Sequence, residues 1–130
     1  MAITSGTKKI IFEKVKKQLE ACVPPMVKKN SADNCYELIG NKPVPYGYKK
    51  EMVPGMYFAS VVMRTDSVNF YFFPAYMNPG EFNNMAPTIY KCLKGKTCFH
   101  FKKEEQVNEK ELKALLKKGI QAWKKADYMK

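Results

Sequence analysis

Aromatic and β-branched residues crowd the segment 57–76, and this run constrains the fold of the 130-residue chain more than any other feature. Two stretches, 57–64 and 68–73, have the composition of β-strands, and the polar residues at 65–67 between them are typical of a hairpin connection. A later aromatic stretch, 97–101, is expected to add another strand. Together they predict the centre of an antiparallel sheet with one apolar face and one face of mixed polarity.

The register of the hairpin follows if its loop contains only Thr65 and Asp66. The inner, core-facing positions are then every second residue from Tyr57 to Met63 and from Val68 to Phe72. The cross-strand pairs on that face are Met63–Val68, Val61–Phe70 and Ala59–Phe72. The opposite face would carry Ser60, Val62, Arg64, Asn69, Tyr71 and Phe73. A slip of one residue would exchange the two faces, because side chains alternate along a strand.

An amphipathic helix at about 7–22 is expected to cover the apolar face of the sheet from the N-terminal side. Its apolar side chains recur at helical spacing, and its lysines lie on the opposite side. The apolar stripe contains Ile11, Val15, Leu19 and Cys22, with Phe12 beside it. Pro24 and Pro25 are expected to end the helix, because neither can continue its hydrogen-bond ladder.

The C-terminal helix has the clearest boundary signals. Asn108 is expected to cap it, Glu111 to complete a capping box, and Val107 to contact Leu112. The buried stripe contains Leu112, Leu115, Leu116, Ile120 and Trp123. Gly119 lies on this stripe, where the absence of a side chain permits close approach to the sheet. The fold class is therefore α+β: an antiparallel β-sheet with N-terminal and C-terminal helices packed on one face.

The remaining segments give weaker signals. Residues 33–39 are expected to form a strand, and 40–55, which is rich in proline and glycine, a long loop or an interrupted edge strand. Residues 87–93 are expected to form a short helix that begins at Pro87, with Gly95 as its C-terminal cap. In the strands 33–39 and 97–101, alternation places inward Tyr36, Leu38, Phe99 and Phe101, and outward Cys35, Glu37, Cys98 and His100.

Length and charge limit the classes of protein to which this chain can belong. The chain is expected to be one domain, 1–130, without a signal peptide or membrane span, and to be cytoplasmic with no membrane partner. Lysine supplies 22 of its 23 basic residues, and the net charge is +11. The excess lies mainly in 1–30, at +5, and in 107–130, at +4. Solvated helix faces account for it, and the functional alternative is weak, sequence-independent binding of nucleic acid or another polyanion.

The residues that could carry chemistry form no recognisable catalytic or metal motif. The four cysteines, Cys22, Cys35, Cys92 and Cys98, contain no CxxC pair, so they are expected to be reduced and structural. His100 is the only histidine; it is expected to be a polar strand residue, with a role as a general base as the alternative. Neither a metal nor a cofactor is expected, and the balance favours a protein that is not an enzyme.

The most informative candidate site is the polar and aromatic face of the sheet. The predicted ligand-binding residues are Glu37, Arg64, Asn69, Tyr71 and His100, flanked by Cys35, Cys98, Ser60 and Phe73. Aromatic and polar groups mixed on a concave surface suit a small ligand. The leading hypothesis is therefore a non-enzymatic module that binds a small molecule, or a second copy of itself as a homodimer, through this face.

The order of elements also resembles the YdhG-like proteins, the DUF1801 domain family. The matching strings are Val68-Asn-Phe-Tyr-Phe-Phe-Pro-Ala-Tyr76, Ala86-Pro-Thr88 and Leu93-Lys-Gly-Lys-Thr-Cys-Phe-His-Phe-Lys102, followed by the C-terminal helix. The resemblance covers about 57–125 well and the N-terminal third loosely. It implies a compact α+β domain with helices packed on an antiparallel sheet.

Some members of that family carry a frataxin-like iron-chaperone label, so the resemblance also implies iron as a possible cargo. Iron binding of the frataxin type uses an acidic ridge, since hard cations need clustered oxygen ligands. Residues 1–30 contain only Glu13 and Glu20 as carboxylates, and Glu104–Glu105 is the only adjacent acidic pair. Iron-chaperone activity therefore ranks behind ligand binding and polyanion binding.

Overall fold

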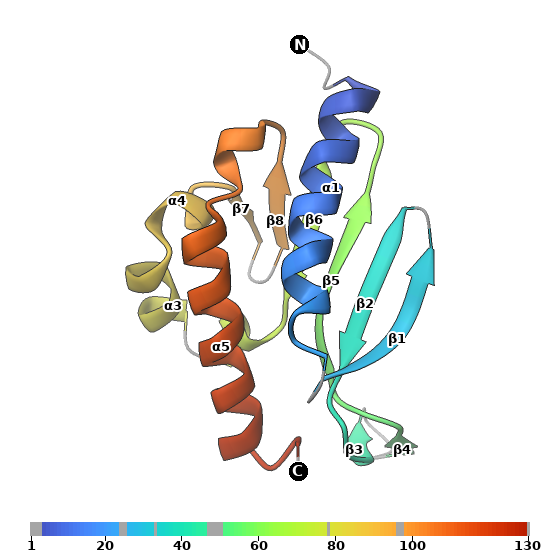
Figure 1. Ribbon diagram of the computed structural model, residues 1–130. Helices are drawn as coiled ribbons and strands as arrows, with labels where there is room; N and C mark the ends of the chain where they lie inside the picture. Colours follow the sequence, from blue (N-terminus) through green and yellow to red (C-terminus); the bar gives the residue numbers. More distant parts are fainter. Residues whose placement is uncertain are drawn as a thin grey trace.

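The computed structural model of the chain describes residues 4–23, 26–32, 34–46, 51–77, 79–95 and 98–129 (Figure 1). Its elements, in chain order, are α1 (Ser5–Glu20), β1 (Val27–Ala32), β2 (Cys35–Ile39), β3 (Val44–Tyr46), β4 (Glu51–Val53), β5 (Tyr57–Met63), β6 (Val68–Phe72), α2 (Pro74–Met77), α3 (Pro79–Met85), α4 (Pro87–Tyr90), β7 (Leu93–Lys94), β8 (Cys98–Phe101), a 3-10 turn (Glu104–Gln106) and α5 (Glu109–Lys125).

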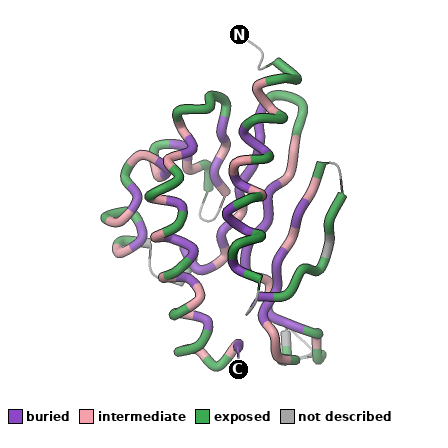
Figure 2. The backbone as a smooth tube through the Cα atoms, viewed as in Figure 1, coloured by how far each residue is buried: buried purple, intermediate pink, exposed green. Residues whose placement is uncertain are grey.

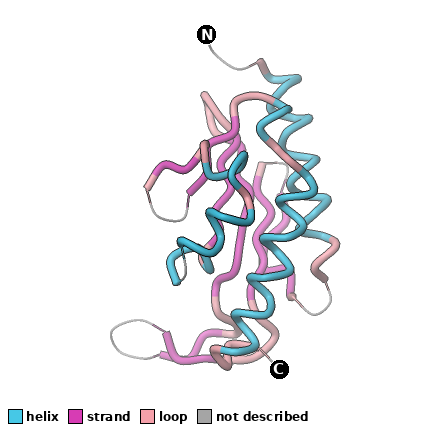
Figure 3. Tube along the Cα trace, turned by 90° about the vertical axis from the view of Figure 1, so that its left-hand side faces the viewer, coloured by secondary structure: helices cyan, strands magenta, loops and turns pink. Residues whose placement is uncertain are grey.

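Six strands form one antiparallel sheet in the order β1-β2-β5-β6-β8-β7, and β3 pairs with β4 in a separate two-stranded sheet. Helices α1 and α5 lie side by side over one face of the large sheet, in front of it in Figure 1 and to its right in Figure 3. The predicted α+β class, with both terminal helices on one face, is confirmed. The opposite face has no helix against it in the described parts of the chain, and we call it the outer face.

The predicted register of the β5–β6 hairpin is confirmed. Met63 pairs with Val68, and the Arg64 N–H donates to the Ser67 carbonyl, which leaves Thr65 and Asp66 as the loop. The inner-face residues Ala59, Val61, Val68, Phe70 and Phe72 are all fully buried. In Figure 2 the buried residues, in purple, recur along the central strands and along both long helices.

The prediction that Tyr57 belongs to the core is wrong, because β5 contains a bulge. Leu38 of β2 pairs with Ala59, but the next residue, Ile39, pairs with Tyr57, so Phe58 is an extra residue on β5. Phe58 and Ala59 are both fully buried. The Phe58 ring lies edge-on to Trp123, with centroids 5.8 Å apart. The bulge thus breaks the alternation and turns Tyr57 toward the outer face.

Several elements were not predicted: β1, the β3–β4 hairpin, α2, α3 and β7. The segment 40–55 is an arm whose two ends meet: the Gly40 N–H donates to the Met56 carbonyl, and Gly55 lies against the backbone of Gly40. The helix expected at 87–93 ends earlier, at Tyr90, and Gly95 has a φ of +86° after β7 instead of capping a helix. The expected stop at Pro24–Pro25 lies outside the described residues.

The start of α5 matches the predicted cap but not the full capping box. The Asn108 side chain accepts from the Glu111 N–H at 3.0 Å, as expected. The Asn108 N–H, however, donates to the Gln106 carbonyl. The Glu111 carboxylate accepts instead from the Thr88 and Ile89 N–H groups of α4, at 2.9 and 3.1 Å. Glu111 therefore joins the first turns of two helices.

We expect Glu111→Ala to lower the free energy of unfolding by about 1–3 kcal/mol, because it leaves two partly buried N–H groups without their acceptor. Denaturant unfolding measures the loss. Lys110→Ala, an exposed change on the same helical turn, is the control and should have almost no effect. Equal stability of the two variants would contradict this role for Glu111.

Gly119 permits the close approach of α5 to the sheet, as predicted. A Cβ atom at Gly119 would lie 2.8 Å from Phe72 Cζ and 3.0 Å from Phe58 Cε1. Both rings are fully buried and have little room to move.

Gly119→Ala should therefore destabilise the fold by about 1–3 kcal/mol, although alanine favours a helix. Gly6→Ala is the matched control, since Gly6 is also helical and has open space around its Cβ position. That change should be neutral or slightly stabilising in thermal unfolding. A gain in stability for Gly119→Ala would show that α5 does not lie this close to the sheet.

Candidate functional site

Strand pairing brings most of the predicted site residues onto the outer face. One row across the sheet contains Glu37, Ser60, Tyr71 and Cys98, which are cross-strand partners in β2, β5, β6 and β8. A second row contains Cys35, Val62, Asn69 and His100. Because side chains two apart on a strand share a face, both rows lie together. Arg64 follows at the end of β5, opposite Ser67.

A chain of hydrogen bonds fixes the side chains along β6. The Ser67 hydroxyl donates to Asn69 Oδ1 at 2.6 Å, and Asn69 Nδ2 lies 3.4 Å from the Tyr71 hydroxyl. Asn69 is only 6% exposed, so its amide supports Tyr71 and offers little surface to a ligand. Burial raises the pKa of the Cys98 thiol, and its hydrogen bond with Tyr71 opposes part of that rise. These hydrogen bonds thus hold the Tyr71 side chain in place.

Tyr57 is fixed in a similar way on the neighbouring strand. Its hydroxyl is hydrogen-bonded to the buried Ser60 hydroxyl, and its ring lies edge-on to Phe73, with centroids 6.1 Å apart. Burial strongly raises the pKa of Tyr57, and the nearby Glu37 carboxylate adds to the rise. The Tyr57 phenol is therefore neutral across the physiological pH range and can donate or accept a hydrogen bond.

These fixed side chains border a hollow of about 460 Å³ on the outer face. Its lining residues come from β1, β2, β5 and β6, from the end of β6, and from the arm formed by β3 and β4. They are Lys29, Glu37, Ile39, Val53, Gly55, Tyr57, Tyr71 and Phe73. We call this site the outer hollow. It is mostly aromatic and aliphatic, with one carboxylate and one ammonium group.

Two bulges on either side of β2 shape the outer hollow. Phe58 is the extra residue of β5, and Lys29 is the extra residue of β1, since Lys28 pairs with Leu38 and Asn30 with Glu37. Both irregularities flank Leu38. A bulge bends its strand and increases the local twist, so paired bulges curve the sheet at this point. They also bring Lys29 and Tyr57 to the rim of the hollow.

The charged pair in the outer hollow is loosely held. Lys29 Nζ lies 3.7 Å from Glu37 Oε2, and the Lys29 side chain is 58% exposed whereas that of Glu37 is 22% exposed. An exposed pair at this distance contributes little to stability. The Glu37 carboxylate can therefore exchange Lys29 for a positively charged group on a ligand without a large loss.

Of the five predicted site residues, Glu37 and Tyr71 line the outer hollow, Asn69 supports Tyr71, and Arg64 and His100 do not line it. The positive charge of Arg64 acts on the thiols of Cys35 and Cys98, where it opposes the rise in pKa that burial causes. Burial, together with Lys94 and Lys102, lowers the pKa of His100. Among the described residues, the His100 ring has no hydrogen bond or ion pair that would orient it as a base.

Sequence reasoning missed Lys29, Ile39, Val53, Gly55 and Tyr57. The bulges and the arm bring them to the site, and neither has a pattern in the sequence that fixes its position. Tyr57 did carry one signal: its hydroxyl would be costly in a dry core without a partner. That cost favours Tyr57 over Phe58 as the residue turned outward.

The thiols and metal ligands, the hydropathy of the helices, and the comparison with known proteins give three further findings. In the described part of the chain, all four cysteines are free thiols, and no three His, Cys, Asp or Glu side chains lie close enough together to hold a metal ion. No described helix is long and apolar enough to cross a membrane. No protein-family model, curated protein or solved structure matches this chain. The resemblance to the YdhG-like family therefore stays a prediction.

His100 gives a direct test of the electrostatics at the β8 end of the outer face. We expect its pKa to lie below 6.5, because the partly buried imidazolium would face Lys94 and Lys102. Between the pKa of His100 in the folded protein and its higher pKa in the unfolded chain, the unfolded chain binds more protons. The free energy of unfolding should therefore fall as the pH drops through about 6.5. An NMR titration reads this single histidine without overlap. A pKa above 6.5 in the folded protein would contradict the arrangement.

Proposed function

We propose that this protein is a non-enzymatic binding module and that the outer hollow is its site for a small organic molecule. The observation that supports the proposal most directly is the convergence of aromatic walls on a single accessible carboxylate, Glu37. Small-molecule sites are typically concave, mostly apolar, about 300–1,000 Å³ in volume, and supplied with few polar groups. The outer hollow has each of these properties.

The chemistry of the walls favours a flat or apolar molecule that carries a positive charge. The rings of Tyr57, Tyr71 and Phe73 present aromatic surface, and Ile39 and Val53 present aliphatic surface. Aromatic faces attract cations as well as other rings. Glu37 would accept the charged hydrogen bond, in place of Lys29. An aryl-alkyl amine has the required combination.

The hydrogen bonds beneath the site favour binding without a large rearrangement. Tyr71 is supported by Asn69 and Ser67, and Tyr57 by Ser60. A ligand that meets ordered side chains loses less conformational entropy on binding. Self-association through the same face, the other form of this hypothesis, would instead require this curved surface to match a second copy of itself.

The test is a binding titration with phenethylamine, followed in ¹⁵N-labelled protein by NMR. We expect saturable shifts at the residues of the outer hollow. Affinity should fall by about tenfold or more in Glu37→Gln and in Tyr71→Ala, since removing one charge-assisted hydrogen bond or one aromatic wall costs about 1.4 kcal/mol or more. His100→Asn, on the same face but outside the hollow, is the matched control and should bind as the unaltered protein does.

Two outcomes would overturn the proposal. One is an equal affinity of phenethylamine for all three variants, each shown to be folded. The other is no saturable binding of phenethylamine or of its neutral analogue ethylbenzene. Sedimentation of the same samples distinguishes self-association: a dimer that Tyr71→Ala dissociates would assign the face to contact between copies.

A further inference from the structure

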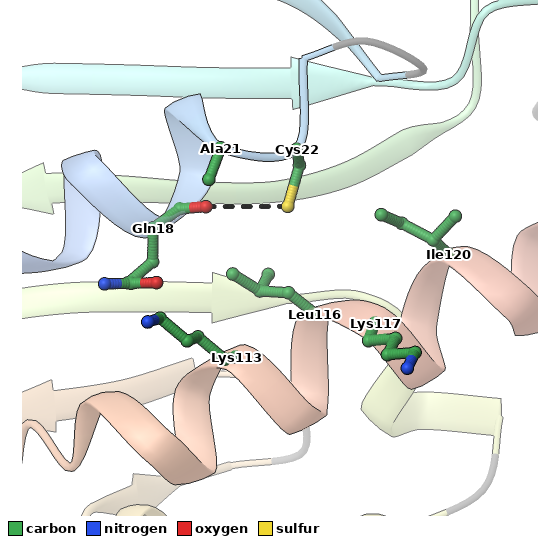
Figure 4. A pocket seen from close by; sticks show the side chains of 7 residues that line it. All are labelled: Gln18, Ala21, Cys22, Lys113, Leu116, Lys117 and Ile120. Carbon is green, nitrogen blue, oxygen red and sulfur yellow. Dashed lines mark hydrogen bonds between the residues drawn. The ribbon is translucent and has the colours of Figure 1, made fainter.

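A second pocket lies on the other side of the molecule, between the end of α1 and the middle of α5 (Figure 4). It has a volume of about 250 Å³. Helix α1 contributes Gln18 to its lining, with Ala21 and Cys22 just beyond the helix, and the remaining residues come from α5. None of them belongs to the outer hollow, so the two sites are independent. We call this second site the interhelical pocket.

The floor of the interhelical pocket is apolar and uncharged. Leu116 and Cys22 are buried and Ile120 is partly buried at the contact between the helices. The Cys22 thiol donates to the Gln18 carbonyl at 3.5 Å. Burial raises the pKa of Cys22 to about 11, so the thiol is protonated at neutral pH. This part of the pocket therefore suits a short hydrocarbon group.

The polar end of the pocket is formed by the side-chain amide of Gln18. Gln18 is 5% exposed, yet its side-chain amide forms no hydrogen bond with any described residue. In Figure 4 the amide is directed into the space between the helices, on the side where Lys113 lies. The amide atoms are not among the fully buried polar atoms that lack a partner, so they are open to solvent through the pocket. A bound group that hydrogen-bonds the Gln18 amide would take the place of that solvent.

Two ammonium groups border the same space. Lys113 and Lys117 are one helical turn apart on α5, and neither has a carboxylate within ion-pair distance among the described residues. By contrast, Lys118 pairs with Glu81 at 2.8 Å and Lys14 with Glu104 at 2.9 Å. In Figure 4 the Lys113 ammonium lies beside the Gln18 amide, whereas the Lys117 side chain is directed toward the opposite end of the pocket. An anion beside Gln18 would therefore form a charge-assisted contact with Lys113, and Lys117 would add to the positive charge along the rim.

We propose that the interhelical pocket binds a small carboxylate with a short apolar tail. The carboxylate accepts hydrogen bonds from Lys113 and the Gln18 amide, the tail covers Leu116 and Ile120, and Lys117 supplies a second positive charge on the rim. The charges on the rim exclude an amine with the same tail. The net charge of +11 adds a favourable long-range attraction for the anion. The pocket is smaller than a typical drug site, which selects a short ligand.

Such a ligand would also act on the stability of the protein, because it touches both long helices. Binding to the folded state alone raises the free energy of unfolding as the ligand concentration exceeds its Kd. The thermal midpoint should therefore rise with ligand concentration, even though the sheet and the outer hollow are untouched.

The experiment compares sodium hexanoate with hexylamine, which has the same tail and the opposite charge. We expect hexanoate, and not hexylamine, to raise the thermal midpoint and to shift ¹⁵N resonances of α1 and α5 saturably. The double variant Lys113→Gln/Lys117→Gln should lower hexanoate affinity by about tenfold or more. Lys110→Gln/Lys124→Gln removes the same charge from exposed positions of α5 outside the pocket and should retain the affinity.

Three results would overturn the proposal. If hexylamine bound with the same affinity as hexanoate, the pocket would be an apolar surface that does not select its ligand by charge. Equal loss of affinity in both double variants would assign hexanoate to the general positive field of the protein, and short polyanions should then compete for it. Absence of saturable hexanoate binding to the folded, unaltered protein would exclude a carboxylate site.

Discussion

The structure depends on two β-bulges beside Leu38 of β2. Each of the two neighbouring strands, β1 and β5, contains one extra, unpaired residue there. On the inner side, the extra Phe58 becomes a fully buried ring between Phe72 and Trp123. On the outer side, the bulge in β5 turns Tyr57 toward Glu37 and the bulge in β1 brings Lys29 there. The two bulges beside Leu38 therefore supply both a central ring of the core and the curvature of the outer hollow. A flat sheet with the same sequence would have neither.

Gly119 provides the matching constraint from the helical layer. Because it has no side chain, α5 can approach close enough for the aromatic rings of β5 and β6 to pack against its backbone. The interhelical pocket lies on this helical layer and the outer hollow on the opposite face of the sheet, so the two candidate sites share no residue. They favour ligands of opposite charge.

Much of the fold could be predicted because short-range rules decided it. A two-residue loop at Thr65–Asp66 leaves one register for β5 and β6, and that register alone places Tyr71 and Asn69 outward. Strand β1 could not be predicted, because Val-Lys-Lys-Asn-Ser-Ala has no alternation and its described side chains are exposed. Strand propensity could not locate the bulge at Phe58 either, since it is similar for Tyr57 and Phe58; only the cost of burying the Tyr57 hydroxyl distinguished the two residues. Glu37 and Tyr71 were therefore identified, whereas Lys29 and Tyr57 required the three-dimensional pairing.

The contact between Gly40 and Gly55 has a consequence for how the outer hollow can change over time. The two ends of the β3–β4 arm meet next to Met56, but the arm is also tied to the rest of the fold, because Val44 is buried in the core and Lys42 pairs with Asp127. Exposed positions such as Met52, next to the wall residue Val53, lie outside these contacts. Substitutions at such positions would change one wall and leave the floor of the hollow intact, so selectivity can diverge there without a cost to the core.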